Sequence, residues 1–161
     1  MILPVFRKQK AGLILDVSSV GGLIDLPSIS IYLSTEFALG GFTESLSDEL
    51  ASQNIVVKIV EPGGGDTAFH TRASQLNTGD GGLDSYRPFM ERANVALSKL
   101  AEGMAPSGRI AAVIYGAVTD GTKRLRYFAA DDVKHLAGAL RKLSDEDYEN
   151  YMREQFAWAG P

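Results

Sequence analysis

Three short segments of the chain combine residue types that can handle a proton on a substrate oxygen. Ser19 follows an apolar run, Tyr32 lies thirteen residues further along the chain, and Pro62-Gly63 ends a second apolar run. A serine hydroxyl can hydrogen-bond a reacting oxygen, and a tyrosine hydroxyl can act as a general acid or base. Each segment alone is common, because serines often form turns after strands and tyrosines often pack at helix starts. Their order and spacing together indicate a reaction site.

The elements around these residues are predicted from hydrophobic periodicity. Residues 12–18 and 55–61 are short, apolar runs bounded by glycine or proline, which is typical of buried strands. Residues 30–53 show helical spacing between them, and residues 124–129 predict a third strand. A strand, a crossover helix and a strand form a right-handed unit with parallel strands. Ligands bind at the carboxyl ends of such strands, where Ser19, Tyr32 and Pro62 would meet.

The remaining pattern is mostly helical and completes an α/β fold. Residues 67–82 are polar and glycine-rich and predict a mobile loop. Helices are predicted over 86–102, 107–121, 131–143 and from 144 onward, with Ser107 and Ser144 as caps. We therefore expect one domain, residues 1–161, with a partial Rossmann-like three-layer fold. Its short parallel sheet has about three strands flanked by helices, and it looks cut off on the side of the first strand.

Composition excludes several classes of function. The chain has 161 residues, a formal net charge of −4, no cysteine and two histidines. We expect no nucleic acid partner, no disulfide and no metal site, and His135 is predicted to lie on the surface. No apolar run reaches the length of a membrane span, and the first residues do not resemble a signal peptide. A soluble, cytoplasmic protein without a membrane partner is the expectation.

The motifs together resemble the short-chain dehydrogenase/reductase family. They are LDVSSVGG at 15–22, YLSTEFA at 32–38 and VEPGGGDT at 60–67, and the likeness continues through 117–127 to the C-terminal helices. The resemblance covers essentially the whole chain, and Ser19 stands thirteen residues before Tyr32, as the family's catalytic serine does before its tyrosine.

The family resemblance implies a role for each of these residues. Tyr32 would be the general acid or base and Ser19 would hydrogen-bond the same substrate oxygen, with hydride passing to or from NAD or NADP. Pro62 and Gly63 would contact the nicotinamide, and Thr67 would bond its carboxamide. Residues 68–103 would close over a small carbonyl or alcohol substrate. The choice between NAD and NADP and the identity of the substrate are not readable from these segments.

The sequence departs from the family pattern at three points. Glu36 stands where the family has a lysine that holds the ribose and lowers the tyrosine pKa. No glycine-rich phosphate turn followed by a helix occurs, since Gly63-Gly64-Gly65 follows the wrong strand and the glycines at 79–82 follow none. Asp16 replaces a common asparagine. We therefore expect cofactor binding and turnover to be impaired or lost in this chain, which would be a truncated member of the family.

Three functions are compatible with these observations. The first is an NAD(P)-dependent oxidoreductase that is impaired or inactive as this chain. The second is a non-catalytic, oligomerising interaction module or pseudoenzyme remnant, which would form a homo-oligomer through the helix at about 30–53 and could also pair through the edge of the first strand. A third, a hydrolase using Ser19, lacks the Gly-x-Ser-x-Gly elbow and has only His70 as a conceivable base.

Overall fold

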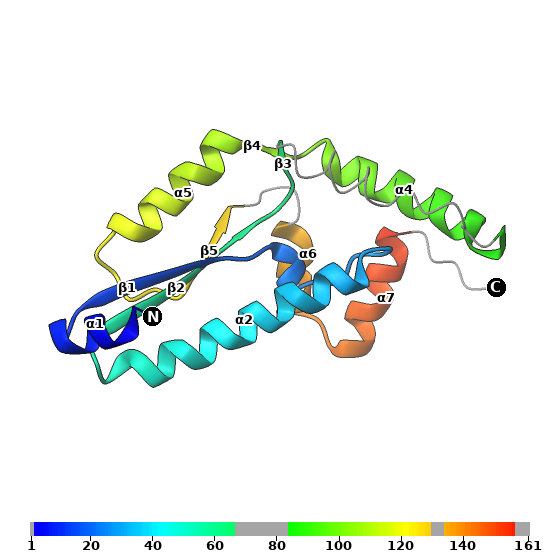
Figure 1. The fold of residues 1–161 in the computed structure, drawn as a ribbon. Helices are drawn as coiled ribbons and strands as arrows, with labels where there is room; N and C mark the ends of the chain where they lie inside the picture. Colours follow the sequence, from blue (N-terminus) through cyan, green and yellow to red (C-terminus); the bar gives the residue numbers. More distant parts are fainter. Residues whose placement is uncertain (1, 67–83, 130–133, 157–161) are drawn as a thin grey trace.

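The centre of the computed structural model is a short parallel sheet (Figure 1). The structure describes residues 2–66, 84–129 and 134–156. Strands β1 (Gly12–Val17), β2 (Ile55–Pro62) and β5 (Arg126–Ala129) lie in the order β1-β2-β5. Gly12 pairs with Ile55 and Ile59 pairs with Arg126, both in parallel register. The three predicted strands are therefore confirmed, and so is the α/β class.

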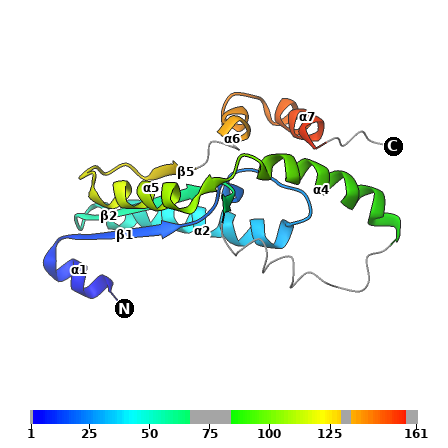
Figure 2. The same ribbon diagram turned by 90° about the horizontal axis from the view of Figure 1, so that it is seen from above.

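Helices cover both faces of this sheet and give three layers (Figures 1 and 2). Successive side chains of β2 point to opposite faces, so a central strand needs apolar residues at nearly every position. On one face, Val60 packs in a cluster with residues of α5 (Ser107–Thr119). On the other, Ile55 and Val57 pack with α1 (Leu3–Gln9) and α2 (Ser30–Ala51). This layering holds the strand ends in place.

A second core lies beyond the carboxyl ends of the strands. It joins the short 3-10 turn η1 (Val20–Gly22) to α4 (Arg87–Ala101), α6 (Lys134–Leu140) and α7 (Asp145–Gln155). Its buried side chains are Val20, Ile24, Leu136, Ala137, Met152 and Phe156. Two-residue strands β3 (Gly65–Asp66) and β4 (Ala105–Pro106) pair in parallel and connect the turn after β2 to α4 and α5. A 3-10 turn, η2 (Asp84–Tyr86), precedes α4.

Some predicted helix ends are confirmed and one is wrong. Ser144 caps α7, because its side chain accepts a hydrogen bond from the backbone N–H of Asp147. Gly121 follows α5 with a φ of 68°, the left-handed conformation that glycine adopts without strain. The prediction that Ser107 caps α5 is wrong, since the cap position is Pro106 and no side chain caps that end. The helix begins one residue earlier than the cap prediction requires.

The long helix α2 has a buried face and an apolar exposed face. Leu33 and Leu50 are buried, whereas Phe37 is 48% exposed and Phe42 is 58% exposed. A Cβ built on Gly40 would lie 3.8 Å from the carbonyl oxygen of Gly22, whereas one built on Gly41 would meet nothing within 4 Å. The backbone of η1 therefore packs against α2 at Gly40, whereas Gly41 has open space beside it among the described residues.

Two further expectations concern the surface and the loop. His135 is exposed, as predicted. No helix within the described residues has both the length and the apolar character that a membrane crossing needs. The predicted mobile loop at 67–82, together with Thr67 and His70, lies outside the described residues.

Candidate active site

The site residues meet where β1 and β2 end. The backbone N–H of Ser18 donates to the carbonyl oxygen of Val60 at 2.9 Å, which extends the pairing of the two strands by one residue. Ser19 then leaves the sheet in an extended conformation and caps η1. Tyr32 enters in the first turn of α2, and Pro62 ends β2. Strand ends and a helix start thus bring Ser19, Tyr32 and Pro62 to one edge of the sheet, as predicted.

The side chains of Ser19 and Tyr32 lie together, and the Ser19 hydroxyl is one of the groups that shift the pKa of Tyr32. The Ser19 Oγ also accepts from the backbone N–H of Gly21 at 3.1 Å and lies 3.5 Å from the carbonyl oxygen of Pro62. A Cβ on Gly21 would lie 3.6 Å from Cε1 of Tyr32, so the tyrosine ring packs directly over this glycine. Two turns, one after each strand, therefore fix the serine hydroxyl beside the tyrosine hydroxyl.

The electrostatic surroundings of Tyr32 oppose its ionisation. Burial raises the pKa of Tyr32 above its ordinary value, the hydrogen bond from Ser19 lowers it, and the charge of Glu36 raises it again. The net pKa is raised. A tyrosine that acts as a base at neutral pH needs the opposite shift. The pair therefore has the geometry of a proton-transfer site with the wrong charge beside it.

Glu36 is integrated into the local structure. It lies one turn after Tyr32 on α2, and its Oε2 accepts a hydrogen bond from the Ser18 hydroxyl at 2.8 Å. A Cβ on Gly22 would lie 2.9 Å from the Glu36 backbone oxygen, which leaves room only for glycine where η1 passes the helix. The close approach of η1 to α2 explains why Ser18 can reach the Glu36 carboxylate.

Asp16, the third departure from the family pattern, points away from the reaction site. Its Oδ2 lies 2.8 Å from the hydroxyl of the buried Thr43 on α2. This contact ties the middle of β1 to the helix. Asp16 is not among the groups that shift the pKa of Tyr32. The carboxylate of Asp16 is therefore engaged with α2 and not with the Ser19–Tyr32 pair.

The Pro62-Gly63 turn presents backbone atoms rather than side chains. The N–H of Gly63 bonds the carbonyl oxygen of Ala129 at 3.4 Å, and the carbonyl oxygen of Gly64 accepts from Ala105 at 2.8 Å. Gly65 continues into β3. The third predicted contact, Thr67, lies outside the described residues, so Pro62 and Gly63 are placed at the site and Thr67 is not.

The residues present fit one end of a nicotinamide dinucleotide and not the other. The hydroxyl pair and the turn after β2 provide donors and acceptors suited to a carbonyl or alcohol and to a carboxamide. A pyrophosphate needs backbone N–H groups at a helix N-terminus. The run Gly63-Gly64-Gly65 leads into a strand instead, and within the described residues no glycine-rich turn opens a helix after a strand. Glu36 adds a negative charge one turn after Tyr32 on α2.

Two buried charged residues on β2, Lys58 and Glu61, were not predicted from the sequence. Lys58 is 2% exposed and donates to Asp120 Oδ1 at 2.6 Å, to the Ala117 carbonyl oxygen at 2.6 Å and to the Tyr127 hydroxyl at 3.1 Å. Burial lowers the pKa of Lys58, but the hydrogen bonds to Asp120 and Tyr127 together outweigh this effect, so the net pKa is raised. Lys58 thus fastens β2 to the C-terminal end of α5.

Glu61 lies on the opposite face, immediately before Pro62. It is 1% exposed and pairs with Arg126, which also pairs with Glu44 of α2 at 2.6 Å. Burial raises the pKa of Glu61, and Arg126 partly offsets this effect. The sequence does show Lys58 and Glu61 as charged residues within the apolar run at 55–61. A charged side chain in a central strand needs a buried partner, so these two positions could have been predicted to form buried ion pairs.

Comparison with known proteins agrees with the family resemblance. The family model described as short chain dehydrogenase matches residues 1–77. Two uncharacterized oxidoreductases of Schizosaccharomyces pombe are each 32% identical over 155 residues, which are 96% of this chain and 64% of theirs. An oxidoreductase, BOA17, of Botryotinia fuckeliana is 43% identical over 77 residues, 48% of this chain and 28% of its own.

Solved structures of short-chain dehydrogenases have a fold similar to that of this chain. A short-chain dehydrogenase from Streptomyces avermitilis has a TM-score of 0.67 and 28% identity, and the match covers 94% of this chain and 55% of that one. A Burkholderia cenocepacia short chain dehydrogenase in complex with NADP has a TM-score of 0.65 at 18% identity, which supports the fold alone. The chain belongs to the short-chain dehydrogenase/reductase family of oxidoreductases. It spans 64% or less of the length of the relatives named above.

Proposed function

We propose that this chain carries the proton-transfer part of a nicotinamide-dependent oxidoreductase site, and that Glu36 impairs it. The reaction class is the interconversion of a carbonyl and an alcohol. The observation that carries the proposal is the adjacent Ser19–Tyr32 pair at the ends of β1 and β2.

In the proposed reaction, Ser19 and Tyr32 both address the substrate oxygen. Ser19 donates a hydrogen bond that stabilises the negative charge developing there, and Tyr32 Oη gives a proton to that oxygen in reduction or removes one in oxidation. The nicotinamide, when bound, supplies or accepts the hydride. Relatives of this fold have been solved with NADP and with NAD, so either is compatible with the proposal.

Glu36 makes this chemistry slow in the oxidation direction. Ionised Tyr32 would be the base, and a neighbouring carboxylate disfavours a second negative charge. Reduction suffers less directly, because neutral Tyr32 can still donate its proton. The proposal therefore predicts low activity that rises toward alkaline pH when an alcohol is the substrate.

The first test is a titration of the purified chain with NADPH and then NADH, followed by nicotinamide fluorescence. Saturable binding with a dissociation constant below about 100 μM would support the proposal, because typical enzymes bind their ligands in this range. Tyr32→Phe is the matched control, since it removes only the reacting hydroxyl and should bind the cofactor like the wild type. Absence of binding by both proteins at millimolar concentration would overturn the proposal for this chain.

A second candidate function is self-association through α2 without catalysis. The observation that favours it is the apolar face described above, where Phe37 and Phe42 are half-exposed and Gly41 has open space beside it. Exposed aromatic residues around a small residue suit the close packing of a helix from a second copy. Light scattering with Phe42→Glu, and Glu49→Gln as an exposed control on the same helix, tests it. A monodisperse wild-type monomer would exclude this candidate.

A further inference from the structure

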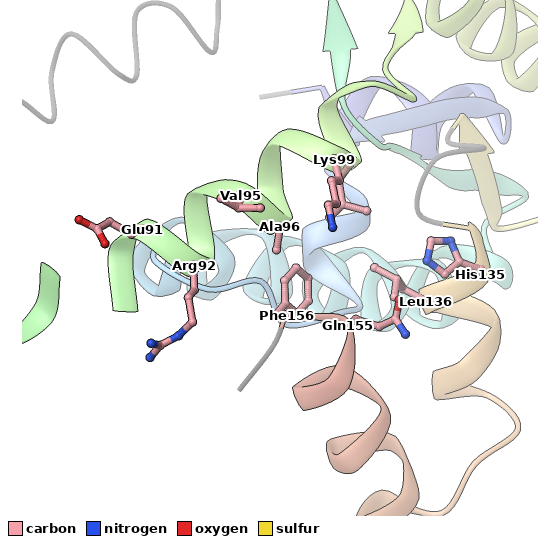
Figure 3. A pocket seen from close by; sticks show the side chains of 10 residues that line it. Glu91, Arg92, Val95, Ala96, Lys99, His135, Leu136, Gln155 and Phe156 are labelled. Atoms are coloured by element: carbon pink, nitrogen blue, oxygen red, sulfur yellow. The ribbon is translucent and has the colours of Figure 1, made fainter. Parts of the chain in front are cut away.

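A cavity of about 370 Å³ lies between α4 and the pair α6 and α7, apart from the reaction site (Figure 3). None of Ser19, Tyr32, Glu36, Pro62 or Gly63 lines it. Its volume is near the lower end of the range of small-molecule sites in proteins. The cavity is therefore large enough for a small organic molecule.

The floor of the cavity is apolar and belongs to the second core. Leu136 is 1% exposed and Phe156 is 2% exposed, and both are members of the buried cluster that joins η1, α6 and α7. Ala96 and Leu100 of α4 pack against the same cluster and close the upper wall. A floor made of core residues is held in place by its neighbours, so it presents a preformed apolar surface.

The wall above this floor carries two cations from one helix. Arg92 and Lys99 are seven residues apart on α4, which places them on the same side of the helix two turns apart. Figure 3 shows the Lys99 side chain reaching from α4 toward the ring of Phe156, while Glu91 lies at the outer end. Within the parts of the chain that the structure describes, neither Arg92 nor Lys99 has an ion-pair or hydrogen-bond partner.

Polar side chains on the opposite wall complete the lining. His135 of α6 and Gln155 of α7 line the cavity together with the two cations. Glu91 also lines the cavity, at its outer end away from the Phe156 ring. Close to the apolar floor, the polar lining is therefore cationic and hydrogen-bonding.

We propose that this cavity is a binding site for a small amphipathic carboxylate, meaning a short hydrocarbon body with one carboxylate group. The hydrocarbon lies on Leu136, Phe156 and Ala96, and the carboxylate accepts hydrogen bonds from Lys99. An inorganic anion would leave the apolar floor wet, and a neutral hydrocarbon would leave Lys99 without a counter-charge. Charge-assisted hydrogen bonds are stronger than neutral ones, so the carboxylate gives the site its selectivity.

Binding at this site has a consequence for α4. The ligand would join α4 to α6 and α7, and α4 is connected through β4 and β3 to the turn after Pro62. A molecule that binds only the folded state also raises its thermal stability. Octanoate should therefore raise the melting temperature of the chain in a concentration-dependent manner.

The test compares octanoate, butyrate and octanol by titration calorimetry on the full chain. Octanoate is expected to bind with a dissociation constant below about 1 mM, and butyrate, with less apolar surface, more weakly. Lys99→Gln should weaken octanoate binding at least about tenfold and leave octanol binding unchanged, because it removes one charge-assisted hydrogen bond. The matched control is Lys123→Gln, another exposed lysine, located between α5 and β5.

A second variant keeps the proposal testable if Lys99→Gln alters the fold. Ala96→Leu fills the floor and should abolish binding of both octanoate and octanol, with an unchanged circular dichroism spectrum. Three results would overturn the proposal: no octanoate binding up to about 10 mM, equal effects of Lys99→Gln and Lys123→Gln, or full binding by folded Ala96→Leu. The second of these would mean diffuse attraction to surface charge.

Discussion

Replacing Glu36 by lysine should make Tyr32 easier to ionise. The two residues lie one turn apart on α2, and the negative charge of Glu36 is one of the causes that raise the Tyr32 pKa. A unit charge at about 5 Å corresponds to ~3 kcal/mol at an effective dielectric constant of about 20, and to ~0.8 kcal/mol in water. Because both side chains are partly exposed, we take about 1 kcal/mol per unit charge. The exchange reverses two units, or about 2 kcal/mol.

This energy should increase the ionised fraction of Tyr32 at neutral pH about 30-fold in Glu36→Lys, since ~1.4 kcal/mol is a factor of ten. Glu36→Gln changes one unit and keeps an acceptor for the Ser18 hydroxyl, so it should give about the square root of that factor. The assay is a pH titration by NMR of protein labelled at the tyrosine ring carbon that bears the hydroxyl. Tyr32→Phe identifies the Tyr32 signal among the six tyrosines.

Glu49→Lys is the control for this prediction. It makes the same change of charge on an exposed position of the same helix, more than three turns from Glu36, so screening should leave Tyr32 nearly unaffected. An unchanged Tyr32 titration in a folded Glu36→Lys protein would refute the Coulombic reasoning. An equal shift in Glu49→Lys would show that net charge, rather than the local pair, controls Tyr32.

Three further predictions concern the buried charges of β2. Arg126→Met should lower the free energy of unfolding by about 3 kcal/mol in a urea titration, because it leaves Glu61 buried without its cation; a loss below about 0.5 kcal/mol would contradict this. Asp120→Ala should lower the melting temperature more than Lys58→Met does, because it leaves the buried Lys58 charge without its carboxylate, whereas Lys58→Met leaves a partly exposed Asp120 that still bonds Thr122 and Tyr127; equal losses would contradict this difference in burial. Lys58 and Tyr127 hold the pKa of Asp120 well below its usual range, so the stability from this pair is present above the ordinary aspartate pKa of about 4 and is lost as the pH falls below it; Asp120→Asn should flatten the acid side of a stability–pH curve.

The arrangement of the sheet could be predicted because its signals are local. The apolar runs at 12–18 and 55–61 are each long enough for a strand and too short for most helices, and glycine or proline bounds them. The meeting of Ser19 with Tyr32 followed from the rule that parallel strands end at one edge. Both inferences need only the order of the elements.

Contacts set by side-chain reach could not be predicted in the same way. The Ser18–Glu36 hydrogen bond depends on how closely η1 passes α2, which Gly22 allows and which no periodicity reveals. Phe37 and Phe42 share helical spacing with Leu46 and Leu50, yet they lie half-exposed, because the buried stripe of α2 is narrower than its apolar positions suggest. The cavity between α4, α6 and α7 depends on the packing of three separate helices.

The fold accommodates Glu36 because its carboxylate has a hydrogen-bond donor, independently of its effect on Tyr32. A carboxylate at this position would cost stability if it were desolvated without a donor. The Ser18 hydroxyl supplies that donor at 2.8 Å, and the side chain remains partly exposed, so the helix and the strand end keep their places. The same carboxylate still acts on Tyr32 through space, where a hydrogen bond to Ser18 does not cancel its charge. Glu36 therefore fits the fold without loss of stability and still opposes the ionisation of Tyr32. In Glu36→Gln, the free energy of unfolding should change little, while the pKa of Tyr32 should fall.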